Sequence, residues 1–291
     1  MTPPDQHSAP ALLLVSPGGR DERGAEAFRS LVAGLGERHP ELPIGGGFVG
    51  TSSPPLADAV ASLVGRGVRS FAVVPLTLSP TGPETAQIPS ALAAEERRHP
   101  GTSYVLGRPL GPDPALLGAL ERRIEEVLGG RRSPMDRART TVLLVGRGST
   151  DPYANAEAHR AARLLWEGRG LAGVETAFVS LAAPDVPAGL DRCRTLGARR
   201  VVVLPYLLFP GVLPDKVAAQ AQGWADVHPE VAVDLADVLA GGDDLFELVL
   251  ERYREAVHGG ARTDWPGGTW TVGPLGGGGR VAVPARGPRG R

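Results

Sequence analysis

Two short turns carry residue types suited to holding an anionic ligand. Residues 16–21 read "SPGGRD" and residues 146–151 read "GRGSTD", and each follows an apolar run that predicts a buried strand. Glycines let a backbone approach a ligand, while arginine, hydroxyl and helix N–H groups bind carboxylates or phosphates. The candidate substrate-binding residues are Arg20, Arg147, Ser149 and Asp151. Asp151 and its counterpart Asp21 have an alternative role, because aspartate at this position commonly caps the following helix.

A third loop carries a candidate catalytic carboxylate. Residues 74–92 read "VPLTLSPTGPETAQIPSAL", in which Glu84 is the only ionisable group. Turned inward, Glu84 could accept a proton or bind a hard metal ion; turned outward, it is an ordinary exposed carboxylate. The later stretch "LPYLLFPGVLPDKVAAQ" is mostly apolar, with Asp215 and Lys216 nearby, and suits one wall of a site for a flat organic ligand.

The sequence gives little support for nucleotide binding or for cysteine chemistry. Neither glycine-bearing turn matches the phosphate loop that ends in Gly-Lys-Ser/Thr or a full dinucleotide fingerprint, so nucleotide binding is not favoured. Cys193 is the only cysteine, which excludes an internal disulfide and a thiolate zinc cluster, and its half-apolar helical setting favours packing. Among six histidines, His159 alone falls close to a candidate loop, where it has either a functional role or a helix-surface position.

Composition describes a globular chain without a strong electrostatic preference. The 291 residues are 42% hydrophobic and 22% charged, with a formal net charge of -1, so neither nucleic acid nor an anionic membrane is an expected partner. No apolar run approaches the roughly 20 residues that a membrane helix needs. The first ten residues, "MTPPDQHSAP", lack a secretion signal, and we therefore expect a cytoplasmic location.

The chain contains an internal duplication with one constant offset between its copies. "FVGTSSPPLADAVASLVGRGVRSFAVVPLTL" from Phe48 aligns without gaps on "FVSLAAPDVPAGLDRCRTLGARRVVVLPYLL" from Phe178. The same offset places "LLVSPGGRD" on "LLVGRGSTD", so that Pro17 corresponds to Arg147 and Asp21 to Asp151. The candidate turns are therefore equivalent positions in two copies of one fold.

Each copy alternates apolar strand runs with amphipathic helix patterns. In the first copy, residues 12–15, 71–78 and 103–107 predict strands, a further strand ends near Phe48 and Val49, and the stretches between these strands have helical spacing. This order predicts an α/β fold of two tandem flavodoxin-like units, each a parallel four- or five-stranded sheet with helices on both faces, facing a central cleft. The expected division is a disordered tail over 1–10, units over 11–128 and 141–258, a linker over 129–140 and a disordered Gly/Pro/Arg-rich tail over 259–291.

The motifs of both copies resemble the class II sirohydrochlorin chelatases, the small cobalto- and ferrochelatases of cobalamin and sirohaem synthesis. The resemblance is carried by "LLLVSPGGRDERGAEAF", "GGGFVGTSSPPLADAV", "VVPLTLSPTGPETAQIP" and "YVLGRPLGPDPALLGAL", and in the second copy by the stretch from "LLVGRGSTD" to "LPYLLFPGVLPDKV". It spans residues 11–258 and implies two chelatase-like units that insert Co2+ or Fe2+, without a permanently bound cofactor, into sirohydrochlorin. It also implies histidines in two places, a His-Gly-Ser/Thr-Arg-Asp turn and a Gly-His loop before Asp-Ile-Pro.

This sequence departs from the resemblance at both histidine positions. The turn "PGGRD" has Pro17, and "GPETAQIP" has Pro83, with Gln87 at the following acidic position. The second copy has Arg147 and Leu213 at the corresponding places. Proline has no side-chain proton to exchange and no lone pair to offer a metal.

Three interpretations follow from these departures. The chain is a sirohydrochlorin chelatase with altered ligands, with Glu84 as the substitute group. Alternatively, it is a catalytically silent pseudoenzyme that binds a tetrapyrrole through Arg20 and Arg147. In the third interpretation, it is a partner subunit for a histidine-bearing chelatase paralogue.

Overall fold

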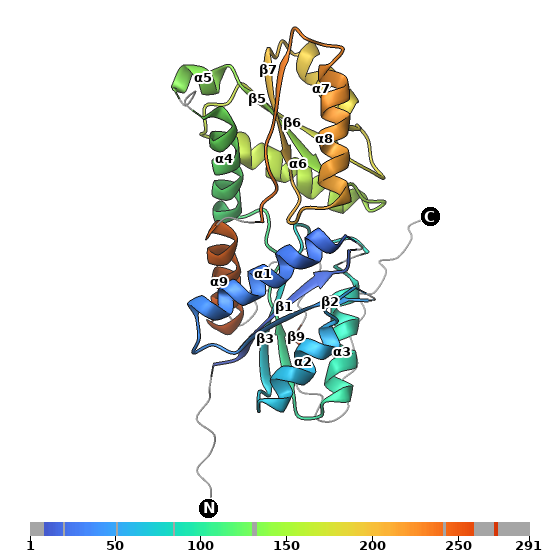
Figure 1. The fold of residues 1–291 in the computed structure, drawn as a ribbon, viewed down its shortest axis with the longest axis vertical. Helices are drawn as coiled ribbons and strands as arrows, with labels where there is room; N and C mark the ends of the chain where they lie inside the picture. The colour runs from blue at the N-terminus through green and yellow to red at the C-terminus, as the bar shows by residue number, and fades with distance from the viewer. Residues whose placement is uncertain are drawn as a thin grey trace, which may run out of the picture.

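A computed structural model of the chain describes residues 9–19, 21–50, 52–83, 85–129, 133–240 and 243–258, together with the backbone of 271–272 (Figure 1). Arg20 and Glu84 lie outside the described residues, as do residues 1–8. Within the described part, every helix is too short or too polar to cross a membrane.

Two separate parallel sheets form the centre of the molecule. The parallel strands of the first have the order β2-β1-β3-β4, with the two-residue antiparallel strand β9 (Thr271–Val272) added beside β4, and the second has the order β6-β5-β7-β8. This confirms the predicted tandem α/β fold class. The strands of the first sheet are β1 (Ala11–Pro17), β2 (Ile44–Val49), β3 (Ser70–Pro75) and β4 (Ser103–Leu106). Those of the second sheet are β5 (Thr141–Gly146), β6 (Gly173–Phe178), β7 (Arg200–Pro205) and β8 (Ala232–Leu235).

The duplication in the sequence is also visible in the structure. Strands β1 and β3 recur as β5 and β7, and their first residues correspond at the offset of the sequence repeat, Ala11 with Thr141 and Ser70 with Arg200. The predicted strand over 71–78 ends earlier, at Pro75. Beyond it the chain leaves β3 for the loop, although the backbone N–H of Leu76 still donates to the Val15 carbonyl oxygen.

Helices cover both faces of each sheet. They are α1 (Glu22–Arg38), α2 (Leu56–Gly65), α3 (Gln87–Arg98), α4 (Pro114–Leu128), α5 (Pro134–Ala138), α6 (Pro152–Trp166), α7 (Val186–Thr195), α8 (Val212–Ala225) and α9 (Asp243–His258). Alternate side chains of β1 enter different cores, because successive residues of a strand point to opposite faces. Leu13 packs with α2 and α3, whereas Leu12 packs with α1 and α9.

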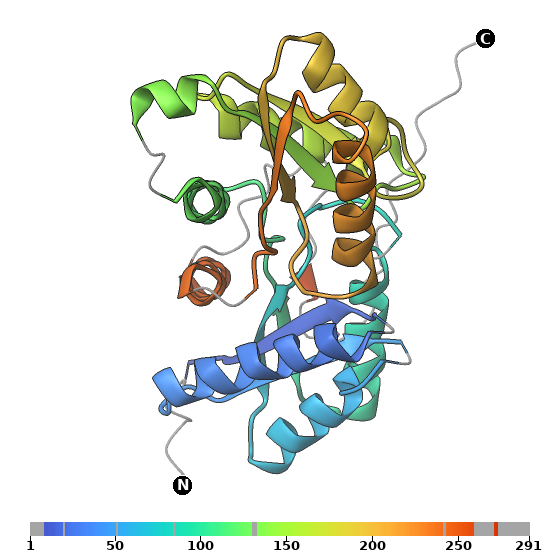
Figure 2. The same cartoon turned by 45° about the horizontal axis from the view of Figure 1, so that its top comes forward.

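The last helix of each repeat lies on the sheet of the other repeat. Helix α4 contacts α6 and β7, while α9 contacts β3 (Figure 1). The two helices lie next to each other along one side of the molecule, which Figure 2 shows nearly end-on. We call the four-stranded sheet of β1–β4 with its packed helices the first unit, and that of β5–β8 the second unit. The predicted boundaries at 11–128 and 141–258 therefore describe the sequence repeats, whereas the packed units exchange their final helices.

A buried ion pair joins the exchanged helices. Arg252 of α9 is 1% exposed, and its Nη2 lies 2.7 Å from Oδ2 of Asp113, the N-cap of α4. The same guanidinium donates to the carbonyl oxygens of Pro109 and Leu110 and to the carboxylate of Glu255. A charged group buried this deeply is stable only with such partners, so Arg252 fixes α9 on the first unit.

Two short elements lie within the ranges predicted as a linker and a C-terminal tail. Residues 133–140 of the predicted linker include the short helix α5, whose N-cap Ser133 forms a capping box with Asp136. Within the range predicted as a tail, 259–291, the backbone of Thr271–Val272 forms β9, antiparallel to β4. The rest of that range lies outside the described residues.

Candidate functional site

The carboxyl ends of the two sheets meet at the centre of the molecule. A Cβ atom at Gly24, in the first turn of α1, would lie 3.1 Å from the Pro210 carbonyl oxygen just before α8. A Cβ at Gly82 would lie 3.6 Å from that of Ala154, in the first turn of α6. Gly24 and Ala154 are equivalent positions of the two repeats. We call the region that contains both contacts the junction. Ligands of open α/β sheets bind at this edge, so the junction is the candidate site.

Asp21 joins the start of α1 to the start of α8, and Figures 1 and 2 both show these helix starts near each other. Its carboxylate accepts a hydrogen bond from the Arg23 backbone N–H at 2.9 Å, which caps α1. The Arg23 side chain is the main cause that lowers the pKa of Asp21, and the backbone N–H groups of Arg23 and Val212 lower it further. Asp21 is therefore the N-cap of α1, and its carboxylate also lies beside the start of α8, where a Cβ on Gly211 would be 3.2 Å from Oδ2.

The turn after β5 is organised by its own side chains. The Asp151 carboxylate accepts from the Tyr153 backbone N–H at 2.9 Å and caps α6, while the Ser149 hydroxyl accepts from the Asp151 N–H. Asn155 forms a reciprocal pair with the Ser149 backbone, donating to its carbonyl oxygen and accepting from its N–H, both at 2.8 Å. The sequence interpretation did not include Asn155, which is recognisable only once α6 brings it back over the turn.

Arg147 lies in this turn with an exposed side chain. A Cβ at the next residue, Gly148, would lie only 1.8 Å from the Ser180 carbonyl oxygen, and its φ of +88° is in the left-handed region. Glycine is therefore required at position 148, because the turn lies against the loop that follows β6.

The two prolines at the departures from the family pattern lie at the same edge of the first sheet. Pro17 is the last residue of β1, partly buried opposite Val49, and Pro83 is exposed in the loop between β3 and α3. Strands β1 and β3 are hydrogen-bonded neighbours, so Pro17 at the end of β1 and Pro83 in the loop after β3 belong to adjacent strands of the sheet. The neighbouring candidates Arg20 and Glu84 lie outside the described residues, and their roles stay predictions.

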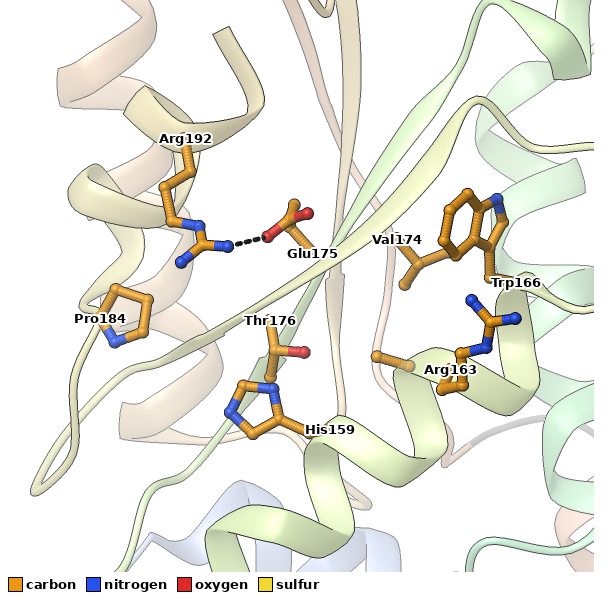
Figure 3. A pocket seen from close by; sticks show the side chains of 9 residues that line it. His159, Arg163, Trp166, Val174, Glu175, Thr176, Pro184 and Arg192 are labelled. Carbon is orange, nitrogen blue, oxygen red and sulfur yellow. Dashed lines mark ion pairs between the residues drawn. The ribbon is translucent and has the colours of Figure 1, made fainter. Parts of the chain in front are cut away.

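Histidine and cysteine do not supply a metal site at the junction within the described ranges. No group of three or more His, Cys, Asp or Glu side chains in that part of the chain could hold a metal ion. His159 of α6 lines a cavity of about 190 Å³ together with Arg163, Trp166 and Glu175 (Figure 3), and its ring packs edge-on against Phe178, the last residue of β6. Burial raises the pKa of Cys193 to about 12, and the thiol packs in the core, as the sequence predicts.

Comparison with known proteins relates both repeats to one family. A family model described as CbiX matches residues 11–127 and again residues 141–256. The sirohydrochlorin cobaltochelatase of Priestia megaterium is 30% identical over 256 residues, which are 87% of this chain and 82% of the relative. The sirohydrochlorin ferrochelatase of Bacillus subtilis (strain 168) is 25% identical over 262 residues, with coverage of 89% and 97%.

Solved structures show the same arrangement of two units. SirB from Bacillus subtilis with Fe3+ superposes with a TM-score of 0.74 at 24% identity, covering 87% of this chain and 97% of that one. The chelatase SirB from Bacillus subtilis subspecies spizizenii in complex with cobalt gives 0.68 at 22% identity, with coverage of 86% and 96%. At these identities the structures support the fold.

Proposed function

Because the chain belongs to the CbiX family, we propose that it is a sirohydrochlorin chelatase that inserts Co2+ or Fe2+ into a tetrapyrrole held at the junction. The observation that carries the proposal is the family match over both repeats, combined with a relative named as a sirohydrochlorin cobaltochelatase that aligns over most of both chains. The ion is a substrate of the reaction. Insertion exchanges one divalent ion for two pyrrole protons, so the site needs a proton acceptor and no oxidant.

The turn after β5 is proposed to bind the peripheral carboxylates of the macrocycle. The hydrogen bonds of Ser149, Asp151 and Asn155 fix the shape of this turn, which leaves the exposed Arg147 at its tip. A guanidinium in this position attracts a carboxylate, and the nearby N-terminus of α6 adds a favourable dipole. Arg20, at the equivalent turn of the first unit, is proposed to act in the same way.

The first unit is proposed to supply the proton acceptor. Pro17 and Pro83 have no side-chain group that could accept a pyrrole proton. Glu84 directly follows Pro83 and is the only ionisable residue of its loop. A carboxylate can take up a proton and can also pass a divalent ion to the macrocycle, so we assign both tasks to Glu84.

A second candidate function is tetrapyrrole binding without metal insertion. It is favoured by one observation, the presence of Pro17 and Pro83 at the two positions where the family resemblance implies histidines. Holding and distorting a macrocycle accelerates metal insertion even with fewer ligands, so the prolines do not by themselves decide between the two functions.

One assay separates these functions. Sirohydrochlorin is added to the full chain, its absorption spectrum is recorded, and Co2+ or Fe2+ is then supplied under anaerobic conditions. The chelatase proposal predicts a spectral shift on binding and then metallation faster than in buffer, with a slower rate in Glu84→Gln. Binding followed by metallation only at the buffer rate supports the second candidate. Absence of any spectral shift contradicts both functions and leaves the partner-subunit interpretation.

A further inference from the structure

Exposed apolar side chains are distributed unequally between the two repeats. The described residues include eight large apolar side chains that are well exposed, and all eight lie beyond residue 134: Met135, Tyr153, Trp166, Leu181, Leu196, Val212, Val227 and Leu235. Scattered surface residues of this kind are ordinary, whereas several at one functional edge indicate a contact surface.

Three of the eight lie in the consecutive connections that follow β5, β6 and β7. Tyr153 is 74% exposed at the start of α6, Leu181 is 65% exposed in the loop between β6 and α7, and Val212 is 67% exposed at the start of α8. All three connections leave the carboxyl edge of the second sheet, where ligands of open α/β sheets bind. We call these three side chains the apolar lip.

Backbone contacts link the lip to the junction. The Ser180 N–H, next to Leu181, donates to the Arg147 carbonyl oxygen at 3.0 Å. A Cβ on Gly211, the residue before Val212, would lie 3.2 Å from Oδ2 of Asp21 in the first unit. Tyr153 donates its N–H to the Asp151 cap. Leu181 and Tyr153 therefore lie beside the turn that carries Arg147, and Val212 lies beside Asp21 on the other part of the junction.

Leu181 is also the one non-glycine residue with positive φ in the described part of the chain, at 60°. A leucine in the left-handed region is strained by about 1 kcal/mol or more, and such strain persists where the surrounding structure requires it. The Leu181 side chain is exposed to solvent, so burial in a core does not account for this backbone conformation.

The equivalent positions of the first repeat do not carry a lip. The offset of the duplication places Tyr153 on Arg23, Leu181 on Thr51 and Val212 on Gly82. The apolar lip is therefore a property of the second unit and not of the repeated fold.

We propose that the apolar lip of Tyr153, Leu181 and Val212 is the wall against which the flat face of the tetrapyrrole packs, with Arg147 beside it meeting the peripheral carboxylates. This inference rests on the proposed function, because it takes the macrocycle as the occupant. The macrocycle has an apolar face that suits the apolar lip, and its peripheral carboxylates suit the guanidinium of Arg147. The lip side chains act by positioning the macrocycle, and none of them takes part in proton or metal transfer.

The test measures sirohydrochlorin binding to the full, metal-free chain by absorption titration. We expect Leu181→Ala and Val212→Ala each to weaken sirohydrochlorin binding by about fivefold, because each change removes apolar area that the ligand covers. The double variant with Leu181→Ala and Tyr153→Ala is expected to weaken binding by more than fivefold. The chain offers matched controls in Leu196 and Val227, which are 70% and 69% exposed after α7 and α8, away from the carboxyl edge. Leu196→Ala and Val227→Ala leave the affinity unchanged.

Leu181→Gly separates binding from folding. Glycine adopts a positive φ without strain, so this variant is expected to unfold at the same or a higher urea concentration than the parent while its sirohydrochlorin affinity falls. If the parent chain binds sirohydrochlorin and the lip variants bind equally well, the lip inference is wrong and the proposed function stands. If the parent chain does not bind at all, the proposed function itself is contradicted.

Discussion

Arg23, in the first turn of α1, donates to both carboxylate oxygens of Asp215 in the first turn of α8, with Nη1–Oδ1 and Nη2–Oδ2 distances of 3.2 and 2.5 Å. The same guanidinium donates to the Asp21 carboxylate from Nε and Nη2. Two helix N-termini from different units thus share one cluster of charges. Helix α8 has Gly211 as its N-cap and no side-chain cap hydrogen bond, and the Asp21 carboxylate of the first unit lies beside this terminus. A negative charge near a helix N-terminus is stabilising.

Replacement of Asp21 by alanine is expected to loosen two helix starts that lie far apart in the sequence. Amide hydrogen exchange becomes faster in the first turn of α1, which loses its capping acceptor, and also in that of α8, which loses the negative charge beside its N-terminus. The control is Asp185→Ala, which removes the N-cap of α7 from the Ala188 N–H. That variant changes exchange in α7 alone. Unchanged exchange at Val212 in Asp21→Ala contradicts the described role of Asp21.

Replacement of Asp113 by asparagine tests the exchange of helices. Asparagine still caps α4, but it leaves the buried Arg252 without its nearest carboxylate, and removing one partner of a buried pair costs about 3 kcal/mol of unfolding free energy. Urea denaturation measures the loss. Asp185→Asn changes an exposed cap of the same type and is expected to cost under about 1 kcal/mol. Equal losses in the two variants would show that Arg252 does not depend on Asp113.

The Asp113 effect has a defined pH dependence. Burial acts to raise the pKa of Asp113, but the hydrogen bonds from Arg252 and from the Ala115 N–H outweigh it and leave the pKa below its ordinary value. A carboxylate with a lowered folded-state pKa stabilises fully above its unfolded pKa of about 3.9 and loses that contribution as the pH falls through the folded-state value. The difference in unfolding free energy between parent and Asp113→Asn therefore shrinks on acidification below about pH 4.

The Cys193 thiol is expected to be inert in the folded chain. With burial raising its pKa to about 12, the thiolate fraction at pH 8 is about a thousandfold smaller than that of an unfolded cysteine. A chromogenic thiol reagent should react with the native chain more slowly than with the urea-unfolded chain by at least that factor. Similar rates in the two states would mean that the core around Cys193 opens readily.

Arg147→Ala is expected to weaken sirohydrochlorin binding and to flatten its dependence on salt concentration. Loss of one guanidinium removes an attraction that salt screens, so parent and variant converge at high ionic strength. Arg194→Ala is the control, because Arg194 lies in the last turn of α7 and pairs with Glu230 instead. If the salt dependence of binding is unchanged in Arg147→Ala, Arg147 is an ordinary surface charge without a specific role in sirohydrochlorin binding.

The sequence predicts the two α/β units, because apolar strand runs and amphipathic helices recur at a constant offset. It does not reveal the helix exchange, since the apolar face of α4 or α9 shows that the helix is covered without showing which sheet covers it. Arg252 illustrates the same limit, because a lone arginine in a helix gives no sign of a buried partner as far away in the chain as Asp113. At the site, the capping alternatives for Asp21 and Asp151 are confirmed, while the contact of Arg23 with Asp215 depends on how the units meet.

The most direct test of this account is the stoichiometry of sirohydrochlorin binding to the full chain, measured by calorimetric titration. If the two units build a single site at their junction, one macrocycle binds per chain, and the same ratio persists when Arg147→Ala lowers the affinity. Two macrocycles per chain, or none, would contradict a shared site between the two sheets.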